Sequence, residues 1–99
     1  MAIVMRYSHP GLTAAKYEEV VKKLEQAGAG SPAGRLYHVC FGDKENLRVS
    51  DIWESQEASE KFGETIKPIL HELGLEGGET EVLEVHNLIA GAKAVSAIP

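Results

Sequence analysis

Residues 35–53, RLYHVCFGDKENLRVSDIW, decide the fold, because they hold two runs of β-forming residues joined by a short polar link. Branched and aromatic residues, which favour strands, recur in both runs, 35–42 and 47–53. The link between them, DKEN (43–46), has the composition of a turn. Two strands with so short a connection form an antiparallel hairpin.

A strand and a helix are predicted before this hairpin. Residues 2–8, AIVMRYS, favour a strand that stops at the turn-forming run His9-Pro10-Gly11. Thr13 has the side chain of a helix N-cap, and apolar residues then recur at helical spacing. Gly28 is expected to end this helix.

A second helix and a last strand are predicted after the hairpin. Ser55 is the expected N-cap, and an apolar stripe of helical spacing follows it. Pro68 lies inside the stripe, so we expect a kink or a restart near Thr65. Gly74 ends the helix, and residues 80–89, TEVLEVHNLI, predict the last strand.

The order β-α-β-β-α-β predicts an α+β fold of the ferredoxin-like type, an antiparallel sheet with both helices on one face. Ninety-nine residues suit one domain, residues 1–99. The other face of the sheet must be solvated or covered by something else. The small, apolar tail, residues 90–99, is expected either to fray or to lie across a partner.

Composition argues against several classes of function. The formal charge of −5 disfavours nucleic acid as a partner. Cys40 is the only cysteine, which excludes an internal disulfide and a cysteine zinc cluster. The N-terminal residues lack the pattern of a signal peptide, and no apolar run approaches the length of a membrane span. We therefore expect a cytoplasmic protein with no membrane partner.

The register of the hairpin decides which side chains share a face. If Cys40 lies opposite Val49, then His38 lies opposite Asp51, and position 36 lies opposite Trp53. We favour this register because a slip of one residue would place Asp51 under the helices without an evident partner.

In this register we expect His38 and Asp51 to lie on the uncovered face of the sheet. In the last strand, the more apolar alternate set begins with Leu83 and Val85, and it is expected to meet the helices. The uncovered face then carries Leu36, His38, Cys40, Val49, Asp51, Trp53, Val82, Glu84, His86 and Leu88. Two copies packed face to face would enclose these residues as a largely apolar cavity, which is typical of a small-molecule site. This pattern predicts a homodimer.

His38 and Asp51 are the candidate catalytic residues, because a carboxylate orients an imidazole and raises its basicity, as a general base requires. The alternative is a structural hydrogen bond between the two. The candidate ligand-binding residues are Trp53, His86, Leu36, Cys40 and Leu88. Trp53 could equally fill the core, and Cys40 could act as a small apolar residue. No closely spaced histidines favour a metal site.

Four segments carry a resemblance to a known group: YHVCFG, LRVSDIWES, KPILHELG and VHNLI. They resemble the dimeric α/β-barrel superfamily, which includes the antibiotic-biosynthesis-monooxygenase-like proteins. The greatest similarity is to small bacterial proteins of that superfamily without an established activity. The resemblance covers most of residues 35–89 and, more loosely, the first strand and helix.

The resemblance implies a homodimer whose two sheets form a barrel. Some members of the superfamily are cofactor-free oxygenases of aromatic polyketides or quinols, and others degrade haem. The haem-degrading members hold iron with a histidine on the helix after the tryptophan, where this sequence has Phe62 and Gly63. We therefore expect no haem, and the lack of a glycine-rich phosphate motif after a strand argues against flavin.

Two functions remain open from the sequence. The first is a binding protein or cofactor-free monooxygenase-like enzyme for a small aromatic or quinone-like compound. The alternative is a non-catalytic dimeric module, for ligand binding or stress, in which the histidines are structural. Neither the substrate nor the presence of catalysis follows from the residues.

Overall fold

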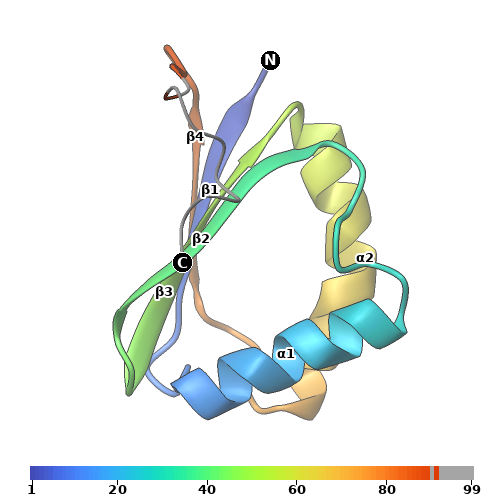
Figure 1. Cartoon of the computed structure of the whole chain (residues 1–99), viewed down its shortest axis with the longest axis vertical. Helices are drawn as coiled ribbons and strands as arrows, with labels where there is room; N and C mark the ends of the chain where they lie inside the picture. The colour runs from blue at the N-terminus through green and yellow to red at the C-terminus, as the bar shows by residue number, and fades with distance from the viewer. Residues whose placement is uncertain (90, 92–99) are drawn as a thin grey trace.

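The computed structural model describes residues 1–89 and 91. Its elements are β1 (Ile3–Ser8), α1 (Ala14–Gln26), β2 (Arg35–Asp43), β3 (Asn46–Trp53), α2 (Gln56–Glu72) and β4 (Glu79–Glu84). The four strands form one antiparallel sheet in the order β2-β3-β1-β4. Both helices lie on the same side of the sheet (Figure 1). The predicted ferredoxin-like α+β fold is confirmed.

Both helices begin at the predicted caps. The Thr13 hydroxyl accepts a hydrogen bond from the Lys16 amide at 3.2 Å, and the Ser55 hydroxyl accepts one from the Ala58 amide at 3.1 Å. Each bond satisfies one of the amides that the first turn of a helix leaves without a partner.

Two backbone hydrogen bonds join the start of α1 to the β2–β3 hairpin. The Ala14 amide donates to the Lys44 carbonyl at 2.9 Å, and the Leu47 amide donates to the Leu12 carbonyl at 2.7 Å. Leu12 and Leu47 are buried in the core beside these bonds. These bonds fix the start of α1 against the turn of the β2–β3 hairpin.

Three predicted boundaries differ from the structure. Asp43 pairs with Asn46, so the hairpin link is two residues rather than four. Helix α2 runs without a restart through Pro68, where buried Ile69 packs into the core. Strand β4 ends at Glu84 rather than at residue 89, because Glu84 already pairs with Ile3, the first residue of β1.

The predicted pairing of His38 with Asp51 and of Cys40 with Val49 is confirmed. A β-bulge then interrupts β2, so Arg35 rather than Leu36 lies opposite Trp53. An inserted residue shifts the alternation of every side chain on one side of it. Leu36 opposite Trp53 was therefore a wrong prediction.

The prediction that His38 and Asp51 lie on the uncovered face is also wrong. His38 bonds to Tyr17 of α1, so this face of β2 and β3 lies beneath the helices. Pairing across β1 and β4 places Val82 on the same side as Met5 and Asp51. Directly opposed residues share a face, so the alternating Leu83, which was predicted to meet the helices, lies on the uncovered side.

The cause of the error is physical. The face was assigned by placing the more apolar set of the last strand toward the helices and by expecting an unpaired Asp51 to be costly beneath them. Asp51 has a partner in His38, which makes its burial tolerable.

No helix among the described residues is both long and apolar enough to cross a membrane.

Candidate functional site

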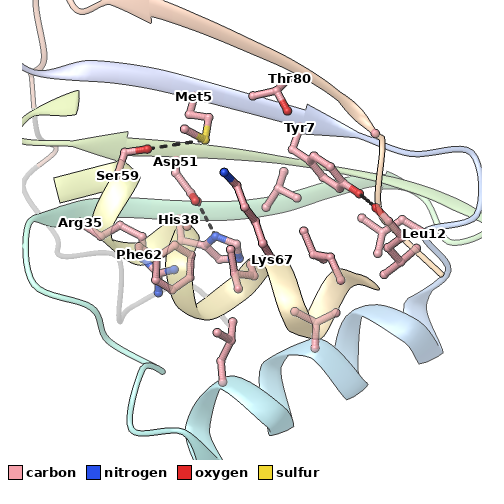
Figure 2. Close-up of a pocket in the computed structure, with 18 of the residues that line it drawn as sticks. Met5, Tyr7, Leu12, Arg35, His38, Asp51, Ser59, Phe62, Lys67 and Thr80 are labelled. Atoms are coloured by element: carbon pink, nitrogen blue, oxygen red, sulfur yellow. Dashed lines mark hydrogen bonds and ion pairs between the residues drawn. The ribbon is translucent and has the colours of Figure 1, made fainter. Parts of the chain in front are cut away.

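A cavity of about 710 Å³ lies between the sheet and the two helices. Its walls are mostly apolar and aromatic, and a small group of polar side chains interrupts them (Figure 2). The apolar lining residues include Met5, Tyr7, Leu12, Val20, Leu24, Val49, Trp53, Phe62, Ile66 and Leu70. The polar ones include Tyr17, Arg35, His38, Asp51, Ser59, Glu60 and Lys67. An apolar cavity with a few polar groups is the usual form of a small-molecule site.

Three of the polar residues form a continuous hydrogen-bonded chain. The distance from His38 Nδ1 to Asp51 Oδ1 is 2.5 Å, and the distance from His38 Nε2 to the Tyr17 hydroxyl is 2.6 Å. The Tyr17 and His38 rings are nearly parallel, with an interplanar angle of 3°. The side chains of His38 and Asp51 are 26% and 15% exposed, so the chain is largely screened from solvent.

The chemistry of the three groups sets the direction of these bonds. An ionised carboxylate only accepts hydrogen bonds, so Nδ1 of His38 carries the hydrogen that Asp51 receives. Nε2 then has a free lone pair, and the Tyr17 hydroxyl donates to it. Asp51 thereby fixes the imidazole in the tautomer whose basic nitrogen faces Tyr17.

Burial is the main cause of a raised pKa at Tyr17. The neighbouring Cys40 and Asp51 also raise this pKa, whereas the charge of Arg35 lowers it. Tyr17 therefore keeps its proton at neutral pH and acts as the donor to His38.

Trp53 belongs to both the core and the cavity wall. It is 1% exposed, and its ring centroid lies 5.2 Å from that of Phe62 at an interplanar angle of 40°. Its indole N–H is buried and has no hydrogen-bond partner among the described residues. An unsatisfied buried donor costs about 1–3 kcal/mol, so packing must outweigh this cost.

Tyr7 lies at the other end of the cavity from Arg35 and Phe62, with His38 and Asp51 between them (Figure 2). The Tyr7 hydroxyl donates to the carbonyl of Leu75 at 2.5 Å, and Leu75 is fully buried. This bond joins β1 to the segment that follows α2. Burial also raises the pKa of Tyr7.

The structure brings three of the predicted site residues together. His38, Asp51 and Trp53 line the cavity, although it lies within one chain and not between two sheets. The roles predicted for these residues stay predictions.

The other four predicted site residues lie elsewhere. Cys40 is half-buried against the core, and burial raises the pKa of its thiol. Leu36 is 49% exposed and belongs to a separate, smaller pocket beside the 31–38 segment. His86 and Leu88 are exposed beyond the end of β4.

Sequence reasoning missed Tyr17 and Arg35. Tyr17 had a recognisable signal, because a hydroxyl-bearing residue stood on the otherwise apolar stripe of α1. Arg35 had no such signal, because no residue type in the run 35–37 predicts the bulge that turns its side chain toward the helices.

The residues of the cavity do not suit a haem group. His38 is the histidine that lines the cavity in the described part of the chain, and both of its ring nitrogens are already hydrogen-bonded. Phe62 and Gly63 of α2 also line the cavity, and neither residue has a side chain that can bind iron. Residues 1–89 and 91 also contain no group of three or more metal-binding side chains.

No family model and no curated protein matches the sequence. Several solved structures share the fold. A candidate antibiotic biosynthesis monooxygenase from Caulobacter crescentus matches with a TM-score of 0.65 and 16% identity, over 87% of this chain and 91% of its own. SnoaB, a cofactor-independent oxygenase from Streptomyces nogalater, matches with a TM-score of 0.58 and 14% identity, over 91% and 96% of the two chains.

A haem-degrading protein from Mycobacterium tuberculosis matches with a TM-score of 0.54 and 17% identity, over 91% of this chain and all of its own. At such identities the likeness establishes the fold. Because one fold hosts different chemistries, the activity has to be argued from the cavity.

Proposed function

We propose that the cavity binds a small aromatic or quinone-like compound and that the Tyr17–His38–Asp51 chain removes a proton from it in a cofactor-independent oxygenation. The observation that carries this proposal is the hydrogen-bonded chain itself, which lines a mainly apolar cavity. A general base needs a basic nitrogen, an orienting partner and access to the substrate.

The proton moves in two linked steps. The Tyr17 oxygen accepts the proton of a phenol, an enol or an acidic CH group, while the Tyr17 hydroxyl proton passes to His38 Nε2. Asp51 stabilises the imidazolium that forms, because its carboxylate already bonds to Nδ1. The raised pKa of Tyr17 fits this role, since the residue relays a proton and does not stay ionised.

The electron-rich substrate anion then reacts with dioxygen without a cofactor. For an acidic CH₂ group, the carbon loses two hydrogens and gains one oxygen atom as a carbonyl, and the second oxygen atom leaves as water. The substrate supplies all the electrons that dioxygen takes up. The fold shared with SnoaB, itself a cofactor-independent oxygenase, agrees with this chemistry.

We also propose that the chain forms a homodimer through the uncovered face of its sheet. Val39 and Leu83 are 51% and 50% exposed there, beside half-buried Val4 and Ile52. An apolar sheet face of this kind is the type of surface that obligate dimers bury.

The test of the activity uses 1,8-dihydroxyanthrone, a planar compound with an acidic CH₂ group. Wild-type protein should consume oxygen and form the anthraquinone faster than buffer alone. The His38→Gln substitution should lower this rate by roughly 10²–10⁴-fold, the usual contribution of a general base.

His71 provides a matched control, because its Nδ1 lies 2.6 Å from Glu76 Oε2 in an exposed histidine–carboxylate pair. The His71→Gln variant should keep the wild-type rate. Equal rates for the His38→Gln variant and the wild type would contradict the catalytic role of the Tyr17–His38–Asp51 hydrogen-bonded chain.

The alternative is a non-catalytic binding module, and one observation favours it. Both ring nitrogens of His38 are satisfied within the protein, as in a purely structural network. Binding of the anthrone, seen as a rise in melting temperature, without any gain in oxygen uptake would support this alternative.

A further inference from the structure

The β-bulge in β2 determines which basic side chain reaches the cavity. Arg35 lies opposite Trp53, and Tyr37 lies opposite Ile52, so the extra residue is Leu36. In a regular strand, residues 35 and 38 would point to opposite faces. The bulge places Arg35 and His38 on the same face, and both line the cavity. Bulges often redirect a side chain in this way beside functional sites.

The guanidinium of Arg35 lacks an acidic partner. Its hydrogen bond goes to the carbonyl of Gly30 at 3.1 Å, and its central carbon lies 5.8 Å from the centre of the Phe62 ring. No carboxylate among residues 1–89 and 91 forms an ion pair with it. A guanidinium has five N–H donors, so most of this donor capacity is unused by the described residues.

The surroundings of Arg35 make an anion a favourable partner. The cavity is mainly apolar, and attraction between opposite charges is stronger there than in water. The planar guanidinium matches a carboxylate with two parallel hydrogen bonds. In Figure 2, Arg35 and Phe62 lie together at one end of the cavity, next to His38.

We propose that the ligand of this cavity is an aromatic carboxylate, with its carboxylate on Arg35 and its ring beside Phe62 and Trp53. This inference rests on the proposed function and adds the chemical class of the ligand. Arg35 then anchors one end of the molecule and directs its acidic hydroxyl or CH group toward Tyr17. The charge of Arg35 already acts on Tyr17, whose pKa it lowers against the effect of burial.

The test compares 2-naphthoate with 2-naphthamide, which has nearly the same shape but no charge. Calorimetry should show that wild-type protein binds the naphthoate more tightly by about tenfold or more, as expected for charge-assisted hydrogen bonds. Trp53 is the only tryptophan, so its single indole N–H signal in an NMR spectrum reports whether the probe enters this cavity.

The Arg35→Gln variant should lose the preference for the naphthoate. Arg48 is the matched control, because it lies over the ring of Phe41 at 5.0 Å on the opposite face of the sheet. The Arg48→Gln variant should keep the preference. The Arg35→Lys variant keeps the charge but lacks the planar guanidinium, so it should keep only part of the preference for the naphthoate. It provides a second test if Arg35→Gln does not fold.

Three results would overturn the inference. Equal wild-type affinity for the two probes would remove the anion preference and leave the proposed oxygenation standing. An unchanged preference in Arg35→Gln would assign the anion to another group, such as Lys67, which also lines the cavity. Failure of both probes to shift the Trp53 signal would count against an aromatic carboxylate, while the anthrone experiment decides the proposed function separately.

Discussion

His38 on β2 and Asp51 on β3 lie directly opposite each other beneath the helices, and 2.5 Å separates His38 Nδ1 from Asp51 Oδ1. Tyr17 reaches this pair from α1, the helix whose start is bonded to the hairpin that carries both residues. The hydrogen-bonded chain Tyr17–His38–Asp51 thus joins α1, β2 and β3, which backbone hydrogen bonds already hold side by side. Substituting any one of the three residues should therefore affect the other two.

Replacing Tyr17 with phenylalanine should remove the donor to His38 Nε2. We expect a loss of about 1 kcal/mol in the free energy of unfolding, the typical value for one hydrogen bond, measured by urea denaturation. If Tyr17 relays the proton, the pH dependence of the oxygenation rate should also change. Tyr37→Phe, on the other face of the sheet, is the control. An unaltered pH profile would restrict Tyr17 to a structural role.

Stability should fall above about pH 10 through Tyr7 and Tyr17. Burial raises the pKa of both residues above the ordinary tyrosine value of 10.0. In this range the unfolded chain loses these protons while the native chain keeps them, so raising the pH favours unfolding. Denaturation series from pH 9 to 11 should show a smaller loss in Tyr7→Phe and Tyr17→Phe than in the wild type. Parallel curves for all three proteins would contradict this.

Two glycine-to-alanine substitutions should have opposite effects. A methyl group on Gly78 would overlap the ring of Tyr7 and the carbonyl of Ser8, so Gly78→Ala should destabilise the fold by about 1–3 kcal/mol. A methyl group on Gly63 meets only Lys67 Cε at 3.7 Å, an ordinary contact inside α2. Gly63→Ala should therefore stabilise the fold by about 0.5–1 kcal/mol. The midpoints of urea denaturation give both changes in the free energy of unfolding. Equal midpoint shifts for the two variants would contradict the close approach of Gly78 to Tyr7 and Ser8.

The wild-type chain should be dimeric by light scattering at micromolar concentration. Val39→Lys places a charge on the uncovered sheet face and should yield monomers, because an unpaired charge is costly to bury. Val82→Lys changes a side chain of similar exposure, 44% against 51%, on the helix-covered side. This control should remain a dimer. A monomeric wild type would leave the uncovered face without the proposed partner.

Local patterns were enough to predict the elements and the pairing of the hairpin. Thr13 and Ser55 mark helix starts through chemistry that depends on nearby residues alone, and the short turn aligns His38 with Asp51. The side of the sheet that the helices cover is a different kind of property. It depends on contacts between residues far apart in sequence, such as the hydrogen bond between Tyr17 and His38 beneath the helices.

The position of Arg35 could not be predicted for the same reason, because it too depends on contacts between separate elements. Strict alternation along residues 35–42 places Leu36 with His38, and no residue in that run demands an interruption. The bulge follows from the pairing of β2 with β3, so sequence reasoning alone assigned the wrong side chain to the cavity.

The bulge also separates position along the chain from position in the cavity. Deleting Leu36 would restore regular alternation and place Arg35 directly before Tyr37, still opposite Trp53 and still facing the helices. In a protein of this fold without the extra residue, the side chain equivalent to Arg35 would therefore stand one position closer to the residue equivalent to His38. A sequence alignment without a gap in this strand would compare that cavity side chain with Leu36 and would miss its true counterpart.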